Sequence, residues 1–143
     1  MASAMKIGID FDNTLISYDI AFSVVGKQEG LLPADFNGGK DAVKSWLLGP
    51  NAGGLLQWER LQGMVYGKRI DHAELFPGVE RFFDLSRERG AKVFIVSHKT
   101  VLAHHDPQQT NLRDAALRWM TGNGFFDRSR FGLAAENVFF EGT

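Results

Sequence analysis

Three short apolar runs constrain the fold of this 143-residue chain more than any other feature of its sequence. They cover residues 6–11, 92–97 and 137–141, are rich in β-branched and aromatic residues, and give way to polar residues. Such runs are typical of strands buried in a sheet. Because helical patterns lie between them, parallel pairing with right-handed crossovers is favoured. The sequence therefore predicts an α/β fold whose parallel sheet is covered by helices on both faces.

Two helices are predicted to connect these strands. The first opens at Pro77 and ends at Gly90. The second begins at Asp106, an N-cap aspartate that is followed by Pro107 at the first helical position and by Gln109 in a capping box. Its apolar positions keep the 3.6-residue period of a buried helix face, and they are Leu112, Ala115, Ala116, Trp119 and Met120.

Residues 18–75 follow a different pattern, with three helical segments and no clear strand. The segments cover about 19–29, 39–48 and 54–67. We therefore predict two parts, an α/β core formed by residues 1–17 and 76–143 and an all-helical insertion formed by residues 18–75.

Charge balance and residue types exclude several classes of function. The formal net charge is −1 and no long run has one sign, which argues against a nucleic-acid surface built on bulk charge. The absence of cysteine excludes a disulfide framework, a thiolate zinc site and a cysteine nucleophile. The apolar runs are shorter than the ~20 residues of a membrane span, and residues 1–6 lack a signal-peptide core. A cytoplasmic protein without nucleic-acid or membrane partners is expected.

Two acids stand at the end of the first predicted strand. Asp10 and Asp12 are two residues apart, so their side chains leave the same face about 7 Å apart, while Phe11 points into the core. The carboxyl ends of parallel strands form the ligand crevice of an open α/β sheet. Two close carboxylates repel each other and need a cation, a shared proton or both. With only oxygen donors available, Mg²⁺ is the natural counter-ion.

These residues resemble the motifs of a known family. Residues 7–15, with their Asp-x-Asp-x-Thr pattern after an apolar strand, resemble the first motif of the haloacid dehalogenase superfamily. Residues 93–97, an apolar strand ending in serine, resemble its second motif. The resemblance implies a three-layer, Rossmann-like core with a parallel sheet, in which the helical insertion takes the place of a small cap.

The resemblance also implies a chemistry for the two acids. Asp10 would be the nucleophile that forms an aspartyl-phosphate, and Asp12 the general acid and base. The Asp10 carboxylate and the main-chain carbonyl of Asp12 would hold Mg²⁺. The second acid marks phosphatases and phosphotransferases, so a magnesium-dependent phosphohydrolase acting on a small phosphorylated metabolite is expected. A phosphotransferase or phosphomutase with the same nucleophile is the alternative.

Further residues would hold the phosphoryl oxygens. The resemblance implies that the Ser97 hydroxyl and the backbone N–H groups after Asp10 take this role. For the Thr14 side chain, bracing the turn is favoured over contact with substrate. A competing interpretation of Ser97 is a simple strand end. A metal site at His104, His105 and Asp106 is disfavoured because adjacent histidines point apart and Asp106 serves as a cap. The expected phosphate-binding set is Phe11, Asn13, Thr14, Ser97 and His98.

Two motifs of the superfamily have no counterpart here. They are a lysine after the third strand and an acidic pair on a fourth strand, whereas this sequence stops at Thr143. Three hypotheses follow. The natural protein is longer and the core shown here is incomplete, or the chain is an inert phosphate-binding or interaction domain, or Lys99 and Glu141 act as local substitutes. The first is favoured, because the sequence stops where a loop into a further helix is expected.

Overall fold

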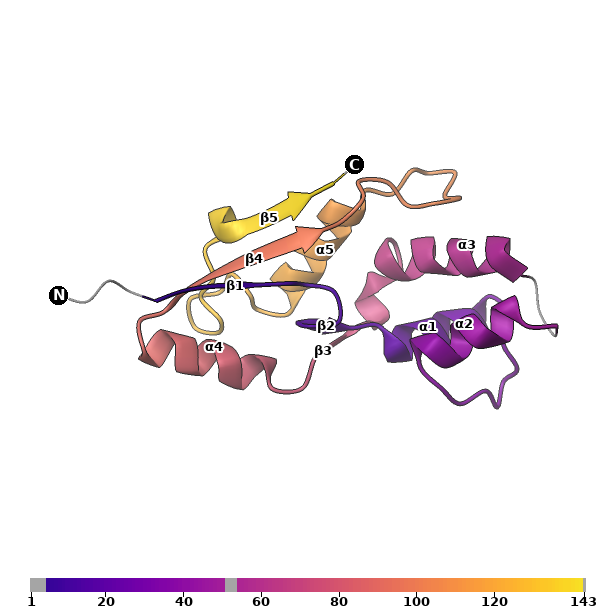
Figure 1. Cartoon of the computed structure of the whole chain (residues 1–143), viewed down its shortest axis with the longest axis horizontal. Helices are drawn as coiled ribbons and strands as arrows, with labels where there is room; N and C mark the ends of the chain where they lie inside the picture. Colours follow the sequence, from indigo (N-terminus) through magenta and orange to yellow (C-terminus); the bar gives the residue numbers. More distant parts are fainter. Residues whose placement is uncertain (1–4, 51–53, 143) are drawn as a thin grey trace.

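The computed structural model describes residues 5–50 and 54–142. Five α-helices and a three-stranded parallel sheet make this part of the chain a mixed α/β protein, compatible with a Rossmann-like fold (Figure 1). The central strand is β4 (Lys92–His98), and it pairs in parallel with β1 (Lys6–Ile9) on one side and β5 (Val138–Glu141) on the other. All three predicted strands are confirmed, with β1 ending two residues earlier than its apolar run.

Two helices cross over between the strands. Helix α4 (Val79–Glu88) precedes β4, and Gly90 follows it with a φ of 65°, a left-handed conformation that glycine adopts without strain. Helix α5 (Leu112–Gly122) lies between β4 and β5. The apolar face predicted for α5 is confirmed, because all of its members are buried: Leu112, Ala115, Ala116, Trp119 and Met120.

The predicted start of the second connecting helix is wrong. Asn111 caps α5, and its side chain accepts two backbone N–H bonds of the first turn at 3.0 Å each. Asp106 instead accepts the backbone N–H groups of Gln108 at 2.9 Å and Thr110 at 3.0 Å, which closes a turn before the helix. The segment between β4 and α5 is a hairpin-like loop, held by a bridge between Leu102 and Asn111.

The prediction that helices cover both faces of the sheet is also wrong for the described residues. Along β4, the buried Val93 and Ile95 alternate with Val96, which is 44% exposed, and Phe139 beside it on β5 is 47% exposed. The chain moves from β1 to β4 to β5 in one direction. Successive right-handed crossovers in one direction place their helices on one face, so α4 and α5 both pack beneath Val93 and Ile95.

The helical insertion has the three helices that the sequence predicts. They are α1 (Asp19–Gln28), α2 (Lys40–Leu48) and α3 (Gly54–Tyr66). Figure 1 shows them grouped beside the carboxyl ends of the strands rather than against a face of the sheet. The stacked rings of Phe22 and Trp58, 5.1 Å apart, join α1 to α3.

A small ribbon closes the insertion at its base. Strand β2 (Ile16–Ser17) pairs antiparallel with β3 (Glu74–Leu75), so the expectation of no strand within residues 18–75 is wrong. Two-residue strands are too short to produce an alternating pattern in the sequence. The ribbon fixes both ends of the insertion next to the loop that follows β1. Two short 3₁₀ helices, η1 (Ile70–His72) and η2 (Ala135–Asn137), complete the described elements.

The one-sided sheet generates a test with two neighbouring residues. Ile95→Ala should lower the free energy of unfolding by about 2–5 kcal/mol, because it opens a cavity in the core. Val96→Ala should cost about 1 kcal/mol or less, because much of this side chain already meets solvent. Urea denaturation of both variants measures the difference. Equal losses would contradict a face open to solvent.

Candidate functional site

The loop after β1 is anchored by Phe11. This side chain is fully buried and meets the Trp119 ring of α5 edge-on at 5.7 Å between centroids. Its carbonyl oxygen accepts the backbone N–H groups of Leu15 at 2.9 Å and Ile16 at 3.3 Å, which folds the loop into a tight turn. The flanking Asp10 is exposed, and the side chain of Asp12 is 30% exposed. The sequence-predicted acids therefore stand at the carboxyl end of β1, with the residue between them fixed in the core.

The expected phosphate-binding N–H groups of this loop are engaged inside the loop itself. The Phe11 N–H donates to Oδ1 of Asp10 at 2.8 Å, and the Asn13 N–H donates to the carbonyl of Ile16 at 2.9 Å. The Thr14 N–H reaches the Phe11 carbonyl at a longer 3.3 Å. Asn13 and Thr14 expose their side chains, and Asn13 has a left-handed φ of 61°. A phosphoryl oxygen bound by these N–H groups would replace internal hydrogen bonds.

Lys99 is the cation nearest to the acids. Its Nζ lies 3.2 Å from both carboxylate oxygens of Asp12, and the residue is only 5% exposed. The same Nζ stands 5.7 Å from the ring centroid of Phe11 and 5.4 Å from that of Tyr66. A buried ammonium needs compensation, which here comes from one carboxylate and two aromatic faces.

Ser97 lies near the end of β4, and Lys99 comes directly after that strand. Both side chains are buried, whereas His98 between them is exposed on the opposite side of β4. The Ser97 Oγ has no hydrogen-bond partner among the described residues. A buried hydroxyl without a partner is unusual and marks a place for a ligand or water. The structure thus buries Ser97 on the side of β4 to which Lys99 also points, and exposes His98 on the other side.

The helical insertion contributes two tyrosines to this cluster. The Tyr18 hydroxyl, just before α1, donates a hydrogen bond to Oδ1 of Asp12. Burial first, and then the carboxylate of Asp12, raises the pKa of the Tyr18 phenol well above its ordinary value, so it remains a donor at neutral pH. The Tyr66 ring, at the end of α3, meets the Tyr18 ring edge-on at 4.7 Å. Tyr18 therefore contacts Asp12 directly, and Tyr66 packs against Tyr18 and the Lys99 ammonium.

The donor set allows a magnesium ion that shares its coordination with substrate and water. The exposed carboxylate of Asp10 and the backbone carbonyl of Asp12 are oxygen ligands of the kind that Mg²⁺ prefers, and one or two protein carboxylates suffice when phosphate completes the shell. Residues 5–50 and 54–142 contain no group of three His, Cys, Asp or Glu side chains arranged to hold a metal. Glu141 ends β5, which is separated from β1 by β4, and so stands across the sheet from the acids.

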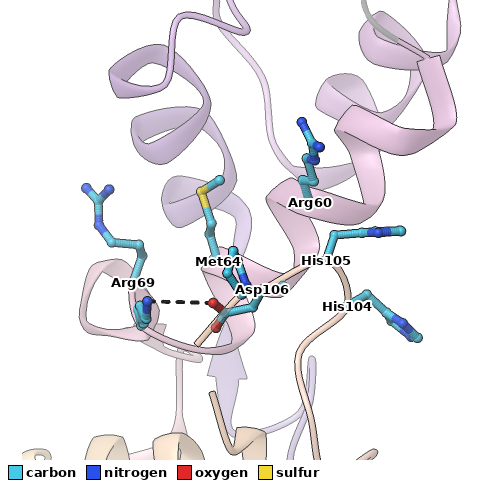
Figure 2. A pocket seen from close by; sticks show the side chains of 9 residues that line it. Arg60, Met64, Arg69, His104, His105 and Asp106 are labelled. Carbon is cyan, nitrogen blue, oxygen red and sulfur yellow. Dashed lines mark ion pairs between the residues drawn. The ribbon is translucent and has the colours of Figure 1, made fainter. Parts of the chain in front are cut away.

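A cavity of about 290 Å³ lies apart from the acids, between α3 and the loop after β4. Figure 2 shows that Arg60, Arg69, His104 and His105 around it point outward rather than toward one another. Lys68 and Asp106 form an ion pair across it at 3.6 Å. The rings of His104 and His105 lie 6.3 Å apart between centroids, and Nε2 of His105 lies 2.7 Å from a carboxylate oxygen of Glu59. The labelled side chains of this cavity do not converge on one point, as those of a binding site do.

Neither a scan of protein-family models nor a search among curated proteins finds a match to this sequence. Within the described residues, none of the helices has both the length and the apolar character of a membrane span.

Asp106 generates a prediction about acid stability. The hydrogen bond from the Thr110 hydroxyl, followed by the Gln108 backbone N–H, lowers the pKa of Asp106 to about 2. A carboxyl whose pKa falls on folding stabilises the native state above its ordinary pKa of about 3.8, and this contribution disappears as the pH falls through about 2. Asp106→Asn should therefore be less stable than wild type at pH 6, and the two urea midpoints should converge near pH 2.

Asp35→Asn, at an exposed loop position, is the control and should shift the midpoint little at either pH. A wild-type advantage over Asp106→Asn that persists unchanged at pH 2 would contradict the assignment.

Proposed function

We propose that this chain is a magnesium-dependent phosphohydrolase of the haloacid dehalogenase type, which acts on a small phosphomonoester through an aspartyl-phosphate. One observation carries the proposal. Two acids follow β1, and the neighbouring parallel strand β4 carries near its end a buried serine hydroxyl that has no partner among the described residues, and leads into a buried lysine paired with Asp12. This edge of a parallel sheet is where α/β proteins bind ligands.

The two acids have environments suited to different roles. Asp10 is exposed, and the Phe11 N–H holds one of its oxygens, which orients the carboxylate for attack on phosphorus. Asp12 is held by Tyr18 and Lys99, which fixes its carboxylate beside the reacting centre. A fixed and partly buried carboxyl group can donate its proton to the leaving oxygen, and the carboxylate that remains can later accept one from water.

The remaining groups would hold the phosphoryl oxygens. The Ser97 hydroxyl is aligned by β4 on the same face as the Lys99 side chain and can donate to an oxygen that enters this space. Bound Mg²⁺ would offset charge on the phosphoryl group. The Asp10 carboxylate and the Asp12 carbonyl are the protein oxygens that would hold it.

The insertion supports a small substrate. Its helices stand at the carboxyl ends of the strands, and Tyr18 and Tyr66 bring it into contact with Asp12 and Lys99. A roof placed this close leaves room for a compact phosphorylated metabolite more readily than for a polymer.

Removing the nucleophile is the direct test. Asp10→Asn should lower kcat by at least ~10³-fold with p-nitrophenyl phosphate and Mg²⁺, because a covalent route is lost. Asp12→Asn should still form the phosphoenzyme with this good leaving group but hydrolyse it slowly. Steady-state kinetics give the first result, and intact-mass detection of one added phosphoryl group gives the second.

Asp41→Asn, on the exposed face of α2, is the matched control and should retain wild-type turnover. Wild-type turnover by Asp10→Asn would contradict a mechanism in which Asp10 is the nucleophile. A wild-type protein that binds phosphate without turning over the ester, with or without Mg²⁺, would instead favour the inert binding domain.

A further inference from the structure

Lys99 is held in place by its backbone as well as by its charge. Its backbone N–H donates a hydrogen bond to the carbonyl of Glu141 at 2.8 Å. Its carbonyl accepts two hydrogen bonds from the guanidinium of Arg113, from Nε at 3.1 Å and from Nη2 at 3.0 Å. The residue stands one position beyond β4, whose strand alternation directs Ser97 and Lys99 to one face. These bonds and the strand alternation therefore hold the Lys99 side chain on the Ser97 side of the sheet before any ligand arrives.

The ammonium has a partner that a bound anion would displace. Asp12 offers one carboxylate, already shared with the Tyr18 hydroxyl, whereas a phosphate dianion offers more acceptor oxygens and more charge. The rings of Phe11 and Tyr66 stabilise a cation over a range of positions along their faces, since cation–π attraction has no single hydrogen-bond direction. Lys99 can therefore shift from the acid to an anion without losing its aromatic surroundings.

We propose that Lys99 is the phosphoryl-binding cation of this site and exchanges between two partners. This inference rests on the proposed function. In the free protein its ammonium pairs with Asp12. When phosphate binds beside Ser97, the ammonium transfers to the phosphoryl oxygens and releases Asp12 for proton transfer. A strand-end lysine two residues after the serine thus supplies positive charge to the phosphoryl group from within the described chain.

Binding of inorganic phosphate, measured by isothermal titration calorimetry on the full chain, tests this without requiring turnover. Lys99→Met should weaken binding about 10- to 100-fold, the effect of losing one charge-assisted hydrogen bond. Lys99→Arg should restore most of the affinity. Lys92→Met, at the exposed opposite end of the same strand, is the matched control and should bind as wild type does.

A double-mutant cycle with Asp12→Asn distinguishes competition between Asp12 and phosphate for Lys99 from simple charge repulsion between Asp12 and phosphate. If Asp12 competes with phosphate for Lys99, then Asp12→Asn should tighten phosphate binding, and most of that gain should vanish in the Asp12→Asn, Lys99→Met variant. The double variant removes both charges together, so it leaves no unpaired buried charge to unfold the loop. Thermal melting checks that each variant is folded.

Phosphate affinity within twofold of wild type in Lys99→Met would overturn the proposal, as would a gain from Asp12→Asn that is undiminished in the double variant. Failure of the proposed function looks different. In that case the wild-type protein binds phosphate through Lys99 but neither hydrolyses p-nitrophenyl phosphate nor becomes phosphorylated on Asp10.

Discussion

The ion pair between Lys99 and Asp12 is the interaction on which the candidate site depends. It joins the loop after β1 to the residue that follows β4. Tyr18 before α1 contacts Asp12, and Tyr66 at the end of α3 contacts Lys99, so the helical insertion meets the same pair. A buried ammonium is costly unless its partner is well placed, and an apolar pair of similar volume would often serve stability as well or better. The arrangement therefore suits a site that handles charge better than it suits a core built for stability alone.

Topology explains why the pair lies where it does. Parallel pairing of β1 with β4 brings their carboxyl ends to one edge, and Phe11 pins the intervening loop against Trp119 of α5. The same topology leaves Val96 and Phe139 open to solvent, because two crossovers in one direction cover only one face. One strand order thus has two results. It puts both crossover helices on one face of the sheet, and it brings the candidate site residues to one edge.

Several of these features could be predicted from sequence, and the failures have identifiable causes. The 3.6-residue period predicted the helices, and the apolar runs predicted the three strands of the sheet, because both patterns report burial. Residue type does not show whether another element covers a side chain. Val96 and Phe139 are apolar like the buried positions, so the sequence could not identify them as exposed. Asp106 and Asn111 are both competent N-caps, and the hairpin-like loop, a tertiary feature, decides that Asn111 begins α5. Motif resemblance predicts Asp10, Asp12 and Ser97 as site residues. Strand alternation is the signal that separates the two residues after Ser97, because it puts Lys99 on the face of Ser97 and His98 on the opposite face.

The position of the two tyrosines couples the insertion to the chemistry proposed for Asp12. Tyr18 precedes α1 and Tyr66 ends α3, and their rings meet edge-on at 4.7 Å between centroids. The Tyr66 ring lies over the Lys99 ammonium, and the proposed exchange of partners would leave it there. The ring shields the ammonium from water, and charge attraction is stronger where the local dielectric is low. A phosphate that replaces Asp12 as the partner of Lys99 would therefore be held more firmly than by an exposed lysine. The insertion would thus contribute to the exchange by keeping water away from the ammonium.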